Sequence, residues 1–189
     1  MDAEQKLEGP NRVHLIISAK SSGAGKFVSK LAAIPREEAQ RRFTQAIDNA
    51  AVEVFDLMVG TPLGASDQAS LPRVADYTAM IGLAGDLCGI LSFRCANASA
   101  VRIAGKMLGT DENTSEECVR DALGEICNMI AGAFKAQISD LAAQCMLSVP
   151  TVVSGKDYQL YPLVDGLRIQ VPRSFEGALI WMTLDLHSS

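Results

Sequence analysis

The chain has 189 residues, enough for one domain with a substantial core. Hydrophobic residues make up 48% of it and charged residues 21%, as in a globular protein rather than a disordered chain or a membrane protein. The net charge of -5 argues against binding to phosphate backbones, so we expect no nucleic-acid partner. We find no long apolar run and no leader-type N-terminus, and we expect a cytoplasmic protein without a membrane segment.

Cysteine and histidine usage excludes several kinds of site. The five cysteines include no C-x-x-C pair, which favours buried thiols in a reducing compartment over a disulfide framework. The two histidines, His14 and His187, lie near opposite ends of the chain. A histidine-based acid-base site or a Cys/His zinc site is therefore disfavoured, and we expect no metal site.

The first 34 residues differ from the rest of the chain. "VHLIISAK" is typical of a short strand and "SSGAGK" of a loop, and we assign residues 1–34 to an N-terminal extension and residues 35–189 to one folded domain. The loop resembles the start of a P-loop, but Lys20 stands where the first glycine belongs and Phe27 replaces the magnesium-binding hydroxyl. A nucleotide site here is the weakest functional alternative.

Two long helices and one short helix are predicted. The first runs from Pro35 to Gly60, with apolar residues at helical spacing. The short helix follows a cap near Asn97 or Ser99 and closes at Gly109.

The second long helix has its own start signal. Thr114 and Glu117 have the spacing of a capping box, and the helical pattern continues to about Ile138.

The remaining segments are typical of strands. "ADYTAMIGLAGDLCGILSFRC" predicts a hairpin that turns at Gly85 and Asp86. Later in the chain, "CMLSVPTVVSG", "DGLRIQV" and "GALIWMTLDL" are short, rich in β-branched residues and bounded by Gly, Pro or Asp. We expect strands in all three.

The two long helices can be aligned with each other. Placing "VEVFDLMVG" over "GEICNMIAG" puts Glu53 on Glu125 and Asp56 on Asn128, and each helix is followed by a hairpin. The sequence therefore predicts an α+β fold of two helix-strand-strand units that share one sheet. The two long helices should pack antiparallel on one face of it.

The second helix carries an unusual polar stripe. Residues spaced four, seven and eleven apart share a helix face, which places Asp121, Glu125, Asn128 and Gly132 together. An apolar stripe on another face should meet the core. Glycine costs about 1 kcal/mol relative to alanine in a helix, so Gly132 on the polar stripe suggests close approach by a partner protein.

The stretch "DALGEICNMIAG", followed by the proline of "LSVPTVVSGK", resembles the signature of the CheC, CheX and FliY family of chemotaxis phosphatases. That signature is Asp or Ser, three residues, Glu, two residues, Asn, about 22 residues and Pro. Asp121, Glu125 and Asn128 match it, and Pro150 follows Asn128 after 21 residues, one short of the usual count. The resemblance covers residues 36–186, and with one intact motif the chain is most similar to CheX.

The resemblance implies a phosphatase that hydrolyses the aspartyl phosphate of a CheY-like response regulator. It implies Asn128 and Glu125 as catalytic residues, with Asp121 and Pro150 contacting the partner. Gly132, on the same stripe, is the further partner-binding residue that we expect from the cost of glycine in a helix. The magnesium ion belongs to the regulator substrate, so no cofactor of the phosphatase itself is expected. CheX-like proteins resemble one another in forming homodimers, and we expect a homodimer here.

An alternative of a different class is a binding module that holds a response regulator, or a component of the flagellar switch, without hydrolysis. The amide at Asn128 favours catalysis, because a docking surface has no need of it at that point. Asp56 stands at the matching position of the first helix and would bring a negative charge beside a phosphoryl group. We expect that copy of the site to be inactive.

Overall fold

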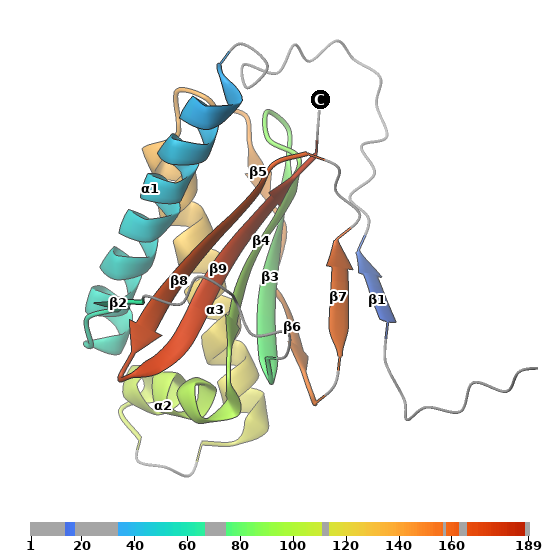
Figure 1. Ribbon diagram of the computed structural model, residues 1–189. Helices are drawn as coiled ribbons and strands as arrows, with labels where there is room; N and C mark the ends of the chain where they lie inside the picture. The colour runs from blue at the N-terminus through green and yellow to red at the C-terminus, as the bar shows by residue number, and fades with distance from the viewer. Residues whose placement is uncertain are drawn as a thin grey trace, which may run out of the picture.

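A computed structural model gives the structure of the chain (Figure 1). It describes residues 14–17, 34–66, 75–110, 114–156, 158–162 and 166–187. The P-loop-like segment and most of the predicted N-terminal extension lie outside these residues.

The predicted helices are confirmed. They are α1 (Arg36–Val54), α2 (Asn97–Leu108) and α3 (Glu116–Gln137). The first long helix continues from α1 as a π-helical turn, η2 (Phe55–Val59), and ends as expected at Gly60, which has a φ of 64°. The π-turn itself was not predicted.

The strands of the described residues form two sheets. Their bounds are β1 (His14–Ile17), β2 (Gly64–Ala65), β3 (Tyr77–Ala84), β4 (Gly89–Cys95), β5 (Met146–Leu147), β6 (Thr151–Ser154), β7 (Gln159–Pro162), β8 (Arg168–Phe175) and β9 (Ala178–Leu186). A seven-stranded antiparallel sheet has the order β2-β8-β9-β4-β3-β5, with β6 also paired to β3. The predicted strand β1 pairs in parallel with β7, a strand that the sequence pattern did not predict.

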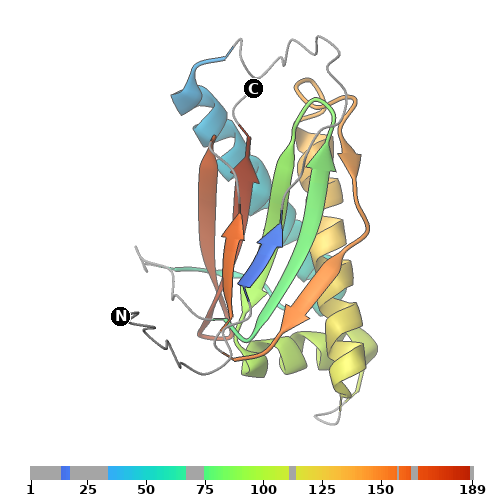
Figure 2. The same cartoon turned by 90° about the vertical axis from the view of Figure 1, so that its right-hand side faces the viewer.

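The elements are arranged in layers. Figure 1 shows α1 and α3 antiparallel on one face of the large sheet, and Figure 2 shows the β1-β7 pair on the opposite face. The hairpins β3-β4 and β8-β9 meet where β4 pairs with β9, while α1 packs on β8 and α3 packs on β3 and β4. The predicted α+β fold is confirmed, and each long helix packs against the hairpin of the other unit.

Aromatic side chains hold the helices to each other and to the sheet. The rings of Phe43 in α1 and Phe134 in α3 meet edge to face, with centroids 5.9 Å apart. At the end of the first helix, Phe55 lies 6.0 Å from Phe93 and 5.6 Å from Phe175. These contacts fix both long helices relative to the sheet, so side chains on their outer faces have defined positions.

Both predicted caps differ from the observed ones. Ala96 occupies the N-cap position of α2, and the Asn97 amide donates to Oδ2 of Asp76 at 2.7 Å, so the cap comes from a residue distant in sequence. In α3 the cap is Ser115, whose Oγ accepts from the amide of Cys118 at 3.3 Å. The predicted capping box that began at Thr114 was therefore wrong by one residue.

The predicted turn of the first hairpin is confirmed. Gly85 has a φ of 108°, and a Cβ at this position would lie 2.3 Å from the carbonyl oxygen of Gln144. Only glycine fits both the backbone angle and this close approach. Among the described residues, no helix is both long enough and apolar enough to cross a membrane.

Candidate active site

One face of α3 is core and another is exposed. Leu123, Ile126, Cys127, Ile130 and Phe134 are fully buried, which confirms the predicted apolar stripe. The predicted polar stripe lies on the other side of the same helix, where Asp121 and Glu125 are exposed and Asn128 and Gly132 are half-buried. The helix therefore presents two carboxylates and an amide on an open surface.

Pro150 lies beside this helix although it is distant in sequence. A Cβ built on Gly124 would lie 3.6 Å from both Cβ and Cγ of Pro150 and 3.5 Å from Cγ2 of Val152. Gly124 stands one turn before Asn128, on the same side of the helix. Pro150 thus borders the polar stripe, and Gly124, which the sequence shows only as an unfavourable residue in a helix, marks the contact.

Gly132 lies on the polar stripe in open space. Apart from the helix's own backbone, a Cβ built on it would meet no atom of the described residues within 4 Å. Packing among the described residues therefore does not account for the glycine. Its role in partner contact stays a prediction.

The matching positions on the first helix differ in backbone as well as in chemistry. Glu53 and Asp56 are both exposed, but Asp56 lies in the π-helical turn η2 whereas Asn128 lies in regular α-helix. A π-turn changes the angular spacing of successive side chains. The two side chains of this copy therefore do not repeat the arrangement of Glu125 and Asn128.

The thiol next to Asn128 faces the core. Sγ of Cys127 lies 3.9 Å from the carbonyl oxygen of Leu91, and burial raises the pKa of Cys127 to about 12. This thiol is neutral near pH 7 and is not a nucleophile there. Among the described residues, no group of three or more His, Cys, Asp or Glu side chains is placed to share a metal ion.

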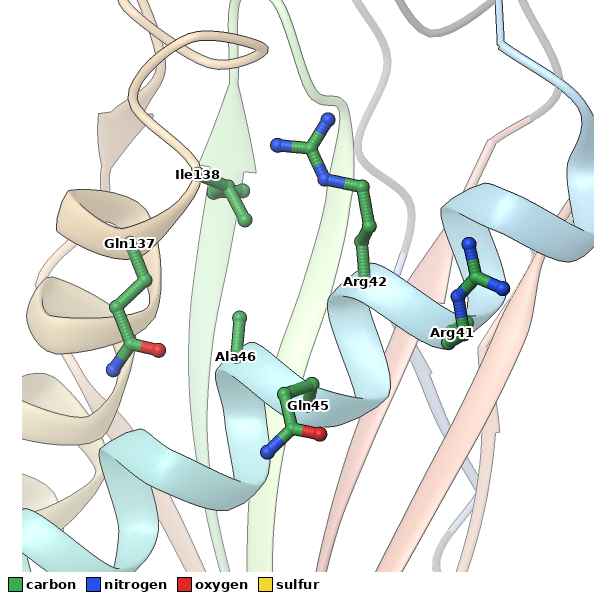
Figure 3. A pocket seen from close by; sticks show the side chains of 6 residues that line it. All are labelled: Arg41, Arg42, Gln45, Ala46, Gln137 and Ile138. Atoms are coloured by element: carbon green, nitrogen blue, oxygen red, sulfur yellow. The ribbon is translucent and has the colours of Figure 1, made fainter.

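A hollow between the two long helices lies elsewhere. It has a volume of about 340 Å³ and is shown in Figure 3. It is lined by Arg41, Arg42, Gln45, Ala46, Gln137 and Ile138. Nη2 of Arg42 donates to both carboxylate oxygens of Asp140, at 2.9 Å to Oδ1 and 2.8 Å to Oδ2. None of the predicted site residues lines this hollow.

An exposed stripe of this kind suits a reacting group that another protein presents. The amide of Asn128 offers both an acceptor and donors without adding charge, and Glu125 one turn earlier offers a carboxylate for a cation. A small-molecule enzyme would instead bury most of its substrate in a concave pocket.

Comparisons with known proteins agree with this fold. The sequence model of the family described as "Chemotaxis phosphatase CheX" matches residues 77–173, just over half of the chain. The CheY-P phosphatase CheX of Thermotoga maritima is 32% identical over 82 residues, which are 43% of this chain and 53% of that protein. The chain thus matches about half the length of this curated relative.

Solved structures extend the similarity. Chemotaxis protein CheX from Vibrio vulnificus superposes with a TM-score of 0.69 and 26% identity, over 82% of this chain and 99% of that one. CheX from Borrelia burgdorferi, solved in a complex with CheY, BeF3 and Mg2+, gives a TM-score of 0.61 and 20% identity over 77% of this chain and 98% of that one. The first match supports family membership and the second supports the fold. With the family model covering residues 77–173, they show that this chain belongs to the CheX family of chemotaxis phosphatases.

Proposed function

We propose that this protein hydrolyses the aspartyl phosphate of a CheY-like response regulator. The observation that carries the proposal is that Glu125 and Asn128 lie one turn apart on the outer face of α3, in a chain of the CheX family. The relative from Thermotoga maritima is named a CheY-P phosphatase, and the one from Borrelia burgdorferi was solved with CheY.

The proposed reaction is in-line attack of water on the phosphoryl group. The carbonyl oxygen of Asn128 accepts a hydrogen bond from the attacking water, while its amino group restrains the geometry. Because the amide is neutral, it does not repel the phosphoryl oxygens. The phosphatase supplies positioning and electrostatic stabilisation and forms no covalent intermediate.

The remaining predicted residues serve the contact between the two proteins. Glu125 pairs with a lysine in the active site of the regulator and sets the register of α3 against it. Asp121, Gly132 and Pro150 contact the regulator around this pair. The magnesium ion is part of the regulator substrate, and we propose no cofactor for the phosphatase.

The decisive experiment follows the decay of a phosphorylated CheY-like regulator with and without this protein. We expect the wild type to accelerate decay, and Asn128→Ala and Glu125→Ala each to lower the acceleration at least tenfold, since each removes a contact made in the transition state. Glu125 is exposed and Asn128 is half-buried outside the core, so the free energy of unfolding should change by less than about 1 kcal/mol.

Matched controls come from the first helix. Glu53→Ala and Asp56→Ala remove the corresponding exposed side chains of the inactive copy and should leave the rate unchanged. Binding of the phosphorylated regulator without faster decay would identify a non-catalytic binding module instead. Absence of both binding and acceleration across several regulators would contradict the proposal.

We further propose a cytoplasmic homodimer with one active site in each subunit, formed by a domain that spans residues 35–189. The proposal rests on the family resemblance and on apolar side chains at the end of the first helix, where Leu57 is 71% exposed. Sedimentation equilibrium should give twice the monomer mass, and Leu57→Ser should weaken the dimer if this helix end forms the interface.

A further inference from the structure

The register of the sheet shifts where β5 gives way to β6 along β3. Leu83 pairs with Leu147 in β5, and Met80 pairs with Thr151 in β6. Three residues between these pairs therefore lie opposite two residues of β3. This arrangement is a β-bulge, which bends a strand, re-aims its side chains and recurs beside active sites.

The bulge consists of Ser148, Val149 and Pro150, and Ser148 holds it in place. The Ser148 amide donates to the carbonyl oxygen of Gly82 at 2.9 Å, and Oγ of Ser148 accepts from the Gly82 amide at 2.9 Å. The same hydroxyl donates to the carbonyl oxygen of Val149 at 2.8 Å. One side chain thus joins the bulge to β3 and fixes the backbone that precedes the proline.

The bulge turns its apolar residues outward beside the polar stripe of α3. Pro150 packs against the helix at Gly124, one turn before Asn128. Val149 is 81% exposed and Met146, on the same edge, is 67% exposed. The segment that borders α3 at Gly124 therefore carries exposed apolar side chains.

We propose that Val149 and Pro150, held by Ser148, form an apolar lip that contacts the response regulator next to its phosphorylated aspartate. The proposal rests on the proposed function and adds Val149 as a docking residue and Ser148 as a positioning residue. The lip is continuous with the face that carries Glu125 and Asn128, so a regulator docked on α3 covers both. Protein–protein interfaces combine polar contacts, which fix the orientation of the partners, with apolar contacts that exclude water.

The test is steady-state dephosphorylation of the phosphorylated regulator over a range of its concentrations. Burial of one valine side chain at the interface predicts that Val149→Ser raises KM about tenfold with kcat unchanged. Ser148→Ala should raise KM in the same direction by a smaller factor, and Ser148→Thr, which keeps the hydroxyl, should restore it. Leu108→Ser, at an exposed apolar residue of α2, is the matched control and should leave KM unchanged.

The outcomes separate this inference from the proposed function. If the wild type is active and both Val149→Ser and Ser148→Ala keep the wild-type KM, the proposed apolar lip is wrong. The phosphatase proposal then remains intact. A wild type without any acceleration overturns both. If Val149→Ser instead lowers the mass seen in sedimentation equilibrium at unchanged KM, the lip contacts a second copy of the chain and the inference is wrong. Val149→Ser alters a surface side chain, so the test does not depend on the folding of the Ser148 variants.

Discussion

Asn128 and Asp56 differ by one functional group at matching positions of the two long helices. The side chains have the same size, but Asp56 carries a negative charge. At 4 Å from a phosphoryl oxygen, with an effective dielectric constant of about 20, such a charge costs about 4 kcal/mol. In the proposed function, the exchange of amide for carboxylate predicts an active site at Asn128 and an inactive copy at Asp56.

Gly132 offers a test that separates stability from partner contact. Because a Cβ at this position meets no other part of the chain that the structure describes, Gly132→Ala should raise the free energy of unfolding by about 0.5–1 kcal/mol through helix propensity alone. If the regulator approaches the helix closely here, the same variant should raise KM severalfold. Urea unfolding and steady-state kinetics measure the two effects. A more stable variant with an unchanged KM would show that Gly132 is not a contact residue.

At the scale of elements, α2 depends on a cap supplied from outside its own sequence. Asp76 stands just before β3, and its carboxylate accepts from the first amide of α2. A carboxylate at a helix N-terminus satisfies a free N–H group and interacts favourably with the helix dipole. This contact joins the start of the first hairpin to the helix that follows it.

Asp76→Ala should therefore lower the free energy of unfolding by about 1 kcal/mol. Asp76→Asn keeps the acceptor and should recover most of that loss. Urea denaturation followed by circular dichroism measures both variants. Equal stability of Asp76→Ala and the wild type would mean that water replaces the carboxylate at no cost.

The sequence predicted the elements with strong periodic patterns. Both long helices, the hairpin at Gly85 and the shared sheet are as expected, because apolar spacing and turn residues are local signals. The cap of α3 was misplaced by one residue because Thr114 and Ser115 are both favourable N-cap residues. The cap of α2 was misplaced because Asp76 is brought to Asn97 only by the tertiary fold. Strand β7, the π-turn η2 and the bulge at residues 148–150 were missed for the same reason.

The candidate site was predicted in part. The stripe of Asp121, Glu125 and Asn128 follows from helical spacing, whereas the position of Pro150 beside Gly124 depends on how β6 pairs with β3. The family signature indicated that Pro150 matters, but the sequence did not show where Pro150 lies in the fold. Gly124 was the available signal, because a glycine inside a helix often marks close packing.

At the scale of the whole molecule, the duplicated units leave a face of each long helix available to a partner protein. The two hairpins form one central sheet, and each helix packs against the hairpin of the other unit. Both long helices therefore keep one face free of the sheet, as Figure 1 shows. In the proposed function, the free face of α3 is completed by the phosphorylated site of the regulator.

The central claim is that the neutral amide of Asn128 promotes hydrolysis. The most direct measurement is the decay rate of a phosphorylated CheY-like regulator at saturating wild type and at saturating Asn128→Asp, a variant of equal size that carries the charge found at Asp56. We predict that the wild type accelerates decay and that Asn128→Asp loses at least tenfold of the acceleration while unfolding at the same urea concentration. Decay at the wild-type rate with Asn128→Asp would contradict the account.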